Sequence, residues 1–242
     1  MLIAGFPAGP WGTNCYVVAA GRGEQCVVVD PGKDAILGID EVVRENRLEP
    51  VAVLLTHGHI DHTWSVVPVC EARGVPAYVH PADQPMLTDP LSGLSAQTRA
   101  VMNEMTGGRL PAIEPDQILE LGDGDVLELA GVSFVVDHAP GHTQGSVMFR
   151  TPGGQEEEPL CFSGDVLFEG SIGRTDLPGG DHSAMLRSLA TKVLPLDDAT
   201  VVLPGHGNQT TIARERRTNP YLRQVLANGP GYDVPDAART GL

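Results

Sequence analysis

A short histidine-rich run at the end of an apolar segment constrains this chain more than any other feature. Residues 51–55 are continuously apolar, as in a strand buried on both faces, and they lead directly into Thr56-His57-Gly58-His59-Ile60-Asp61-His62. Without a metal, three packed histidines would repel one another on protonation and bring several polar groups into one buried place. Imidazole and carboxylate groups are the ligands that suit zinc, iron and manganese. The run therefore predicts a metal site on a loop that a buried strand positions.

Three further candidate ligands come soon after other apolar runs. They are His142, Asp165 and His206, which follow residues 132–137, 160–162 and 200–203. A glycine precedes each of them, and glycine lets the backbone turn sharply enough to bring a side chain to a crowded centre. Together with His57, His59, Asp61 and His62 the set has seven ligands, which fits two cations that share a bridging water.

Two other side chains are candidates for supporting these ligands. Asp30 ends an apolar run, where it either hydrogen-bonds to the metal-binding loop or caps the turn Asp30-Pro31-Gly32. His138 lies four residues before His142 and either orients a ligand or merely packs. His80 and His182 have no supporting pattern, so we expect them to be structural or exposed.

Strand and helix patterns alternate in both halves of the chain. The pattern predicts strands over 15–20, 26–29, 51–55, 75–79, 126–129, 132–137, 146–150, 160–162 and 200–203. It predicts helices over 35–46, from 60 to about 73, over 183–193 and over much of 211–227. Residues 81–116 are weakly patterned, and we expect either a surface connection with one or two short helices or a lid over the site. This alternation indicates an α/β or α+β domain with helices packed outside the sheets.

The length of 242 residues fits one large domain, which we place at 1–227 and follow with a Gly- and Pro-rich tail at 228–242. Sixteen Lys and Arg against 31 Asp and Glu give a formal net charge of −15, which disfavours nucleic acid and anionic membranes as partners. No run of about 18 apolar residues and no signal-like N-terminal segment is present, so we expect no membrane span and a cytoplasmic protein. Four cysteines without CxxC spacing predict reduced thiols rather than a disulfide framework.

In order and spacing, the seven candidate ligands resemble those of the metallo-β-lactamase superfamily. The resemblance covers residues 56–206 and implies an αββα sandwich, in which two mixed sheets pack face to face with helices on the outside. Within the superfamily the chain resembles glyoxalase II, the hydroxyacyl-glutathione thioesterases. Residues 13–16, 164–168 and 170–174 carry that likeness, and residues 214–220 resemble the short, single-domain bacterial members.

The resemblance also implies roles for individual residues. It places His57, His59 and His142 on a first metal, Asp61, His62 and His206 on a second, and Asp165 between the two. It implies that Arg174 contacts the thiol portion of a substrate, the alternative being an ion pair with Asp176 or Asp181. Long glyoxalase II enzymes bind glutathione with a C-terminal helical domain. Few residues follow His206 here, so we expect that domain to be missing and the identity of the thiol to stay open.

The seven ligands predict a site for two divalent ions, and the resemblance implies that it hydrolyses a small thioester such as a hydroxyacyl-glutathione. Zinc is the first expectation, and iron and manganese are the others. The ions would lower the pKa of a bridging water towards about 7 and polarise the carbonyl oxygen. Asp61, the predicted catalytic residue, would orient that water and accept its proton, while a leaving thiol with a pKa of about 8.5 needs no strong acid.

Two alternatives remain at this point. The first is a mononuclear iron dioxygenase that oxidises a persulfide and uses a subset of these ligands, so the number of bound metals separates it. The second is a binding module without catalysis that a metal only stabilises. A structural zinc site is usually closed by four ligands, so seven on several loops disfavour this second alternative.

Overall fold

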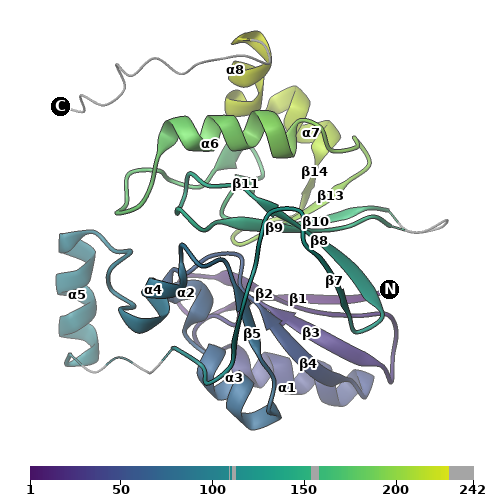
Figure 1. Ribbon diagram of the computed structural model, residues 1–242, viewed down its shortest axis with the longest axis vertical. Helices are drawn as coiled ribbons and strands as arrows, with labels where there is room; N and C mark the ends of the chain where they lie inside the picture. The colour runs from purple at the N-terminus through teal and green to yellow at the C-terminus, as the bar shows by residue number, and fades with distance from the viewer. Residues whose placement is uncertain (109, 111–112, 154–157, 229–242) are drawn as a thin grey trace.

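The chain forms a four-layer sandwich with two mixed six-stranded sheets at its centre. The computed structural model describes residues 1–108, 110, 113–153 and 158–228. Figure 1 shows helices α1 and α3 below the first sheet and helices α6, α7 and α8 above the second. This arrangement confirms the predicted αββα architecture.

The first sheet contains the strands of the N-terminal half in chain order. They are β1 (Leu2–Ala8), β2 (Thr13–Ala19), β3 (Gln25–Val29), β4 (Glu49–Leu54), β5 (Ala77–Val79) and β6 (Ile118–Glu120). The first three strands are antiparallel and the later pairs are parallel. Parallel neighbours need crossover connections, and α1 (Ala35–Asn46), α2 (Ile60–Thr63) and α3 (Val66–Arg73) provide two of them.

The second sheet contains the strands of the C-terminal half, in the order β14-β13-β10-β9-β8-β7. They are β7 (Val126–Leu129), β8 (Val132–His138), β9 (Val147–Thr151), β10 (Leu160–Gly164), β13 (Val201–Pro204) and β14 (Thr210–Thr211). The parallel pair β10–β13 is joined across α6 (His182–Ser188) and a π-helical turn at Leu189–Val193. A small hairpin of β11 (Leu167–Phe168) and β12 (Ser171–Ile172) follows β10.

Strand residues alternate between two buried layers, which explains why the strands are nearly continuous apolar runs. In β2, Val17 packs toward the helices outside the first sheet, whereas Val18 packs between the two sheets. The layer between the sheets is filled by aromatic side chains, with Phe134, Phe149 and Phe162 all fully buried. Because both faces of the inner strands are covered, the loops at their ends have a rigid support.

The structure corrects several predicted elements. The helix predicted from residue 60 to about 73 is divided into α2 and α3 at Trp64–Ser65. Residues 211–227 are largely helical, as predicted, but in two pieces, α7 (Ile212–Thr218) and α8 (Pro220–Asn228), because Pro220 lacks an N–H and the Asn219 Oδ1 accepts from the Tyr221 N–H instead. Strand β1 was not predicted, since its sequence contains Gly5 and Pro7.

Two further predictions concern segments that the structure describes only in part. The described residues of 81–116 contain two short helices, α4 (Gln84–Thr88) and α5 (Ala96–Thr106), which agrees with one of the two expectations stated for this segment. Asn228 still belongs to α8, and residues 229–242 of the predicted tail lie outside the described residues. All four cysteines are free, as predicted, and all four are buried. Within the described ranges, no helix is both long enough and apolar enough to cross a membrane.

Candidate metal centre

The seven candidate ligands converge at one edge of the sandwich. They come from the segments that follow β4, β8, β10 and β13, with Asp61 and His62 in helix α2, so both sheets contribute. The donor atoms form three overlapping groups, each within 4.8 Å, namely His57, His59 and His142; His57, His62 and Asp165; and Asp61, His62 and His206. We call His57, His59 and His142 the first group and Asp61, His62 and His206 the second group. Asp165 lies between the two groups.

The first group consists of three buried imidazoles. The His59 Nδ1 lies 2.9 Å from the His142 Nε2, and the His57 ring stands edge to face against both neighbours. Burial, with the charges of the other histidines contributing, lowers the pKa of His59 to about 4 and that of His142 to about 3. Burial likewise holds the pKa of His57 well below its ordinary value. These rings are therefore neutral at pH 7, and each offers a lone pair.

The second group mixes imidazole and carboxylate and faces outward. The His206 Nε2 lies 3.2 Å from the Asp61 Oδ2, and the His62 Nε2 lies 3.4 Å from the Asp165 Oδ1. Burial alone would lower the pKa of His62, but the carboxylates of Asp61, Asp165 and Asp30 raise it to about 10. The side chains of Asp61 and His206 are 22% and 29% exposed, so the centre is open on this side.

Hydrogen bonds fix which nitrogen of each ring points inward. The Thr56 hydroxyl donates to the Asp30 Oδ2 at 2.6 Å, so its lone pair accepts from the His57 Nδ1–H at 3.1 Å. The His142 Nδ1 donates to the Arg174 carbonyl at 2.8 Å, and the His62 Nδ1 donates to the Asp30 Oδ2 at 3.0 Å. In all three rings the Nε2 is left to face the centre, as in metal-ligating histidines.

Buried atoms without partners show that the residues fit a cation. Among the described residues, the His57 Nε2 and the Asp165 Oδ1 are buried and have no hydrogen-bond partner. A buried acceptor without a partner costs free energy, and a metal ion at the centre would remove that cost. The neutral imidazoles and the carboxylates of this centre are ligands that divalent transition metals prefer.

Two glycines allow the loops to approach this closely. Gly164 has a φ of 47°, and a Cβ there would lie 2.5 Å from the Thr56 Oγ1. A Cβ on Gly205 would collide with the Asp165 Oδ1 and with the His62 ring. The predicted role of the glycine before each ligand is therefore visible at these two positions.

The supporting residues named from the sequence have different surroundings. Asp30 is buried and accepts three hydrogen bonds, from the Thr56 N–H, the Thr56 hydroxyl and His62. His138 stacks on His80 with ring centroids 4.1 Å apart and hydrogen-bonds to the Gln144 carbonyl. Of the two alternatives stated for His138, these contacts agree with packing, because its ring lies against His80.

Arg174 lies at the rim of the centre with an exposed side chain. Its guanidinium makes two hydrogen bonds to Asp176, at 2.7 and 2.8 Å, which is the alternative stated for this residue. Asp181 instead accepts from the Ala184 N–H at the start of α6. The Arg174 charge still reaches the first group, because after burial it is one of the influences that lower the pKa of His59.

The sequence did not reveal Asp83, which lies just before α4 and is fully buried. Its carboxylate accepts hydrogen bonds from the loops on either side of the first group, at Gly58, Thr143 and Gly145. Burial raises the pKa of Asp83, although these three hydrogen bonds oppose the rise. The only available signal was that Asp83 follows β5, the parallel neighbour of the strand that precedes His57.

The start of β2 holds the His206 loop. The Asn14 Nδ2 donates to the Pro204 and Gly207 carbonyls at 3.0 and 2.9 Å, and the Tyr16 hydroxyl donates to the Pro204 carbonyl at 2.7 Å. Thr13 forms an isolated bridge with His206 and donates its hydroxyl to the Asp61 Oδ2 at 3.3 Å. The stretch at residues 13–16 therefore contacts the centre from the first sheet.

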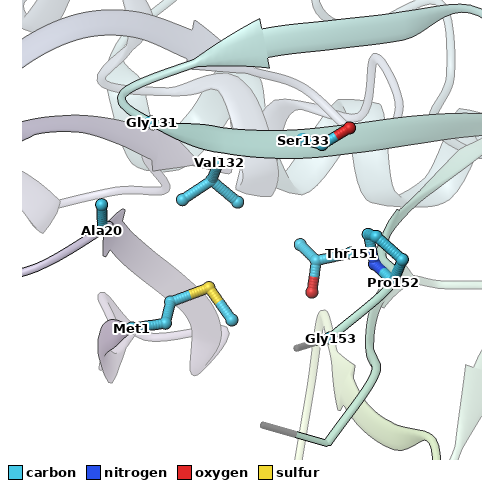
Figure 2. A pocket seen from close by; sticks show the side chains of 8 residues that line it. All are labelled: Met1, Ala20, Gly131, Val132, Ser133, Thr151, Pro152 and Gly153. Carbon is cyan, nitrogen blue, oxygen red and sulfur yellow. The ribbon is translucent and has the colours of Figure 1, made fainter. Parts of the chain in front are cut away.

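One cavity lies far from this centre. It has a volume of about 230 Å³ and is lined by residues at the opposite strand ends, including Met1, Ala20, Gly131 and Thr151 (Figure 2). Ala20 follows the end of β2, whereas Thr13 at the start of the same strand touches His206. The cavity therefore cannot hold a molecule that reacts at the centre.

Relatives of known sequence match nearly the whole chain. An uncharacterized protein of Mycobacterium tuberculosis is 52% identical over 224 residues, which are 92% of this chain and 98% of the relative. The hydroxyacylglutathione hydrolase GloC of Haemophilus influenzae is 35% identical over 209 residues, which are 86% of this chain and 92% of the relative.

Solved structures agree with this likeness. The crystal structure of the BLEG-1 B3 metallo-β-lactamase is 38% identical, with a TM-score of 0.75 over 91% of this chain and 99% of that chain. The crystal structure of TTHA1623 in a di-iron-bound form is also 38% identical, with a TM-score of 0.74 over 90% and 100% of the two chains. The family model of the metallo-β-lactamase superfamily matches residues 8–206, and the chain belongs to that superfamily.

Proposed function

We propose that this protein is a metal-dependent hydrolase that cleaves thioesters of a small thiol, of the hydroxyacyl-glutathione kind. The observation that carries the proposal is the convergence of seven donors, six in two adjoining groups and Asp165 between them, with the second group open to solvent. The 35% sequence identity with GloC, which is named a hydroxyacylglutathione hydrolase, supports this substrate class. The di-iron form of TTHA1623 supports a centre for two ions.

The side of the centre that is open to solvent carries groups that can act on a substrate. Metal ions held by the two groups would lower the pKa of a coordinated water and polarise the substrate carbonyl. The Asp61 carboxylate lies on the open side and accepts a hydrogen bond from the Thr13 hydroxyl at 3.3 Å. This hydrogen bond helps to fix the carboxylate in a position to accept a proton from water. A thiol with a pKa of about 8.5 leaves as thiolate near neutral pH, so a separate acid is not required.

Zinc is the proposed metal, and iron and manganese are the alternatives. Neutral imidazoles with carboxylates suit all three metals, so the ligand set alone does not select one. Elemental analysis of the purified protein, reconstituted separately with each metal, should approach two equivalents per chain. A plateau at one equivalent would favour the mononuclear iron dioxygenase, because the second group would then hold no metal.

The substrate class is tested by parallel assays on one preparation. The metal-loaded protein should release thiol from S-lactoylglutathione and from related hydroxyacyl thioesters, as followed with a chromogenic thiol reagent. The same preparation should consume no oxygen with glutathione persulfide. A parallel assay with a β-lactam substrate is needed because the structure of the BLEG-1 metallo-β-lactamase is similar to this one. We expect turnover of the β-lactam to be far slower than turnover of the thioesters. Thioester turnover no faster than β-lactam turnover would overturn the proposal.

Arg174 is proposed to recognise a carboxylate on the thiol portion of the substrate. The guanidinium is exposed and paired with Asp176, so binding a substrate requires it to leave that partner. We expect Arg174→Ala to raise KM for a carboxylate-bearing thioester about tenfold. This change corresponds to about 1.4 kcal/mol of binding free energy, which lies near the lower end of the range for a charge-assisted hydrogen bond because the guanidinium is exposed. Initial-rate kinetics with a neutral thioester provide the comparison.

Asp176→Asn is the matched variant for this prediction. It removes the charge that competes for the guanidinium, so KM for the charged substrate should fall or stay unchanged. If Arg174→Ala impaired the charged and the neutral thioester equally, Arg174 would have only a structural role in the ion pair.

A further inference from the structure

Asp83 joins the two loops that supply the first group. Its Oδ2 accepts from the Gly58 N–H at 2.9 Å and from the Thr143 hydroxyl at 2.6 Å, and its Oδ1 accepts from the Gly145 N–H at 2.7 Å. Gly58 lies between His57 and His59, and Thr143 directly follows His142. One carboxylate therefore holds the backbone between His57 and His59 and also the side chain that directly follows His142.

The surroundings of Asp83 engage its carboxylate fully in hydrogen bonds to the two loops. The side chain is fully buried, and a Cβ on Gly145 would lie only 2.6 Å from the Asp83 Cγ. Asp83 borders a crevice of about 190 Å³ with Met86 and Gly93, but both of its oxygens are already engaged by the two loops. It is therefore neither a metal ligand nor a group available to a substrate.

We propose that Asp83 is a positioning residue that sets the spacing between the His57–His59 loop and the His142 loop, and thereby the metal affinity of the first group. The loops belong to different sheets, and the hydrogen bonds of one carboxylate fix both at once. Groups that orient metal ligands typically change metal affinity by about ten- to a hundredfold when they are replaced. The proposal rests on metal binding by the seven donors and does not depend on which substrate is cleaved.

Asparagine at this position is a sharp probe because it keeps the shape of the side chain but replaces one acceptor oxygen by an NH2 donor. All three partners of Asp83 donate, so the amide group of Asp83→Asn must face at least one backbone N–H. Either the Gly58 N–H or the Gly145 N–H then loses its acceptor, which weakens the link between the two loops.

Glu215 provides the matched control. It is also fully buried and accepts three hydrogen bonds, from Gly170, Thr210 and Asn219. None of these donors lies within three residues of a candidate ligand. Glu215→Gln therefore makes the same chemical change in an equally buried place without touching the first group.

The experiment measures zinc affinity by competition with a chromophoric chelator in the full chain. A His206→Ala background removes a donor of the second group, so that the tighter binding event reports on the first group. We expect Asp83→Asn to weaken zinc binding in this background by about tenfold or more. Glu215→Gln should change the dissociation constant by less than about threefold. Thermal unfolding of the metal-free proteins is followed in parallel, because a purely structural role would lower Tm without changing zinc affinity.

Two results would overturn the proposal. One is a zinc affinity of Asp83→Asn within about threefold of its parent, and the other is an equal loss in Asp83→Asn and Glu215→Gln. If Asp83→Asn does not fold, Thr143→Val removes the hydroxyl that donates to Asp83 and also contacts the Ser146 hydroxyl, and unchanged zinc affinity in that variant also overturns the proposal. A wild-type protein that binds zinc but cleaves no thioester would contradict the proposed function and leave the role of Asp83 intact.

Discussion

Asp165→Asn should lower the rate of thioester cleavage by about a thousandfold and reduce bound zinc to one equivalent or less. Asp165 is the carboxylate between the two groups, with its Oδ1 3.4 Å from the His62 Nε2 and its Oδ2 3.5 Å from the His142 Nε2. Loss of the metals removes stabilisation of several kcal/mol, and about 4 kcal/mol corresponds to about a thousandfold in rate. Zinc content by elemental analysis and initial rates on the same preparation check both parts.

The metal-free form of this variant should not be destabilised. Burial raises the pKa of Asp165 to about 6, although His62 and His206 oppose the rise, and its buried Oδ1 has no hydrogen-bond partner among the described residues. Replacing this carboxylate by a neutral amide therefore removes a cost in the absence of metal. Asp123→Asn, which changes an exposed acid paired with Lys192, is the control. Near wild-type turnover of Asp165→Asn would contradict the assignment of Asp165 as a ligand.

The second large effect concerns stability. Asp30→Ala should reduce the free energy of unfolding by about 3–5 kcal/mol, the range for removing one partner of a buried charged network. The change leaves the Thr56 N–H, the Thr56 hydroxyl and the His62 Nδ1 without their common acceptor in a fully buried place. Urea unfolding of the metal-free protein measures this loss without interference from zinc.

Asp34→Ala separates the hydrogen bonds of Asp30 from its backbone conformation. Asp30 and Asp34 both have a positive φ, 49° and 63°, which costs an alanine about 1–2 kcal/mol. Asp34 is exposed and pairs only with the neighbouring Lys33 among the described residues. Should Asp30→Ala cost no more than Asp34→Ala, the buried hydrogen bonds of Asp30 would contribute nothing to stability.

The sequence was most informative where short spacing and strand ends combine. The run at 57–62 follows β4 so closely that its position at a sheet edge could be predicted, and glycines before His142, Asp165 and His206 marked the other turns. The apolar runs were recognised as strands because the strands are covered on both faces. Helix boundaries at Trp64–Ser65 and Asn219 depend on local breaks that periodicity does not register.

The residues that sequence reasoning missed act through contacts that only the fold creates. Asp83 is 25 residues from its partner at Gly58 and 62 from its partner at Gly145, so no local pattern marks it. The side chain of Asn14 reaches carbonyls that are 190 and 193 residues away. Arg174 shows the converse, because the neighbouring Asp176 was named beforehand as its alternative partner and does bind it.

The division of the donors between the two sheets has a consequence for how the protein is made. The ribosome completes the first sheet, with His57, His59, Asp61 and His62, before it reaches His142, Asp165 or His206. Neither half alone contains the first group or the second, since each group needs a donor from the other sheet. The first group is therefore complete once the loop after β8 has been made, whereas the second group also needs β13 and its loop. Until β13 joins the sandwich, a nascent chain holds only a partial set of the seven ligands.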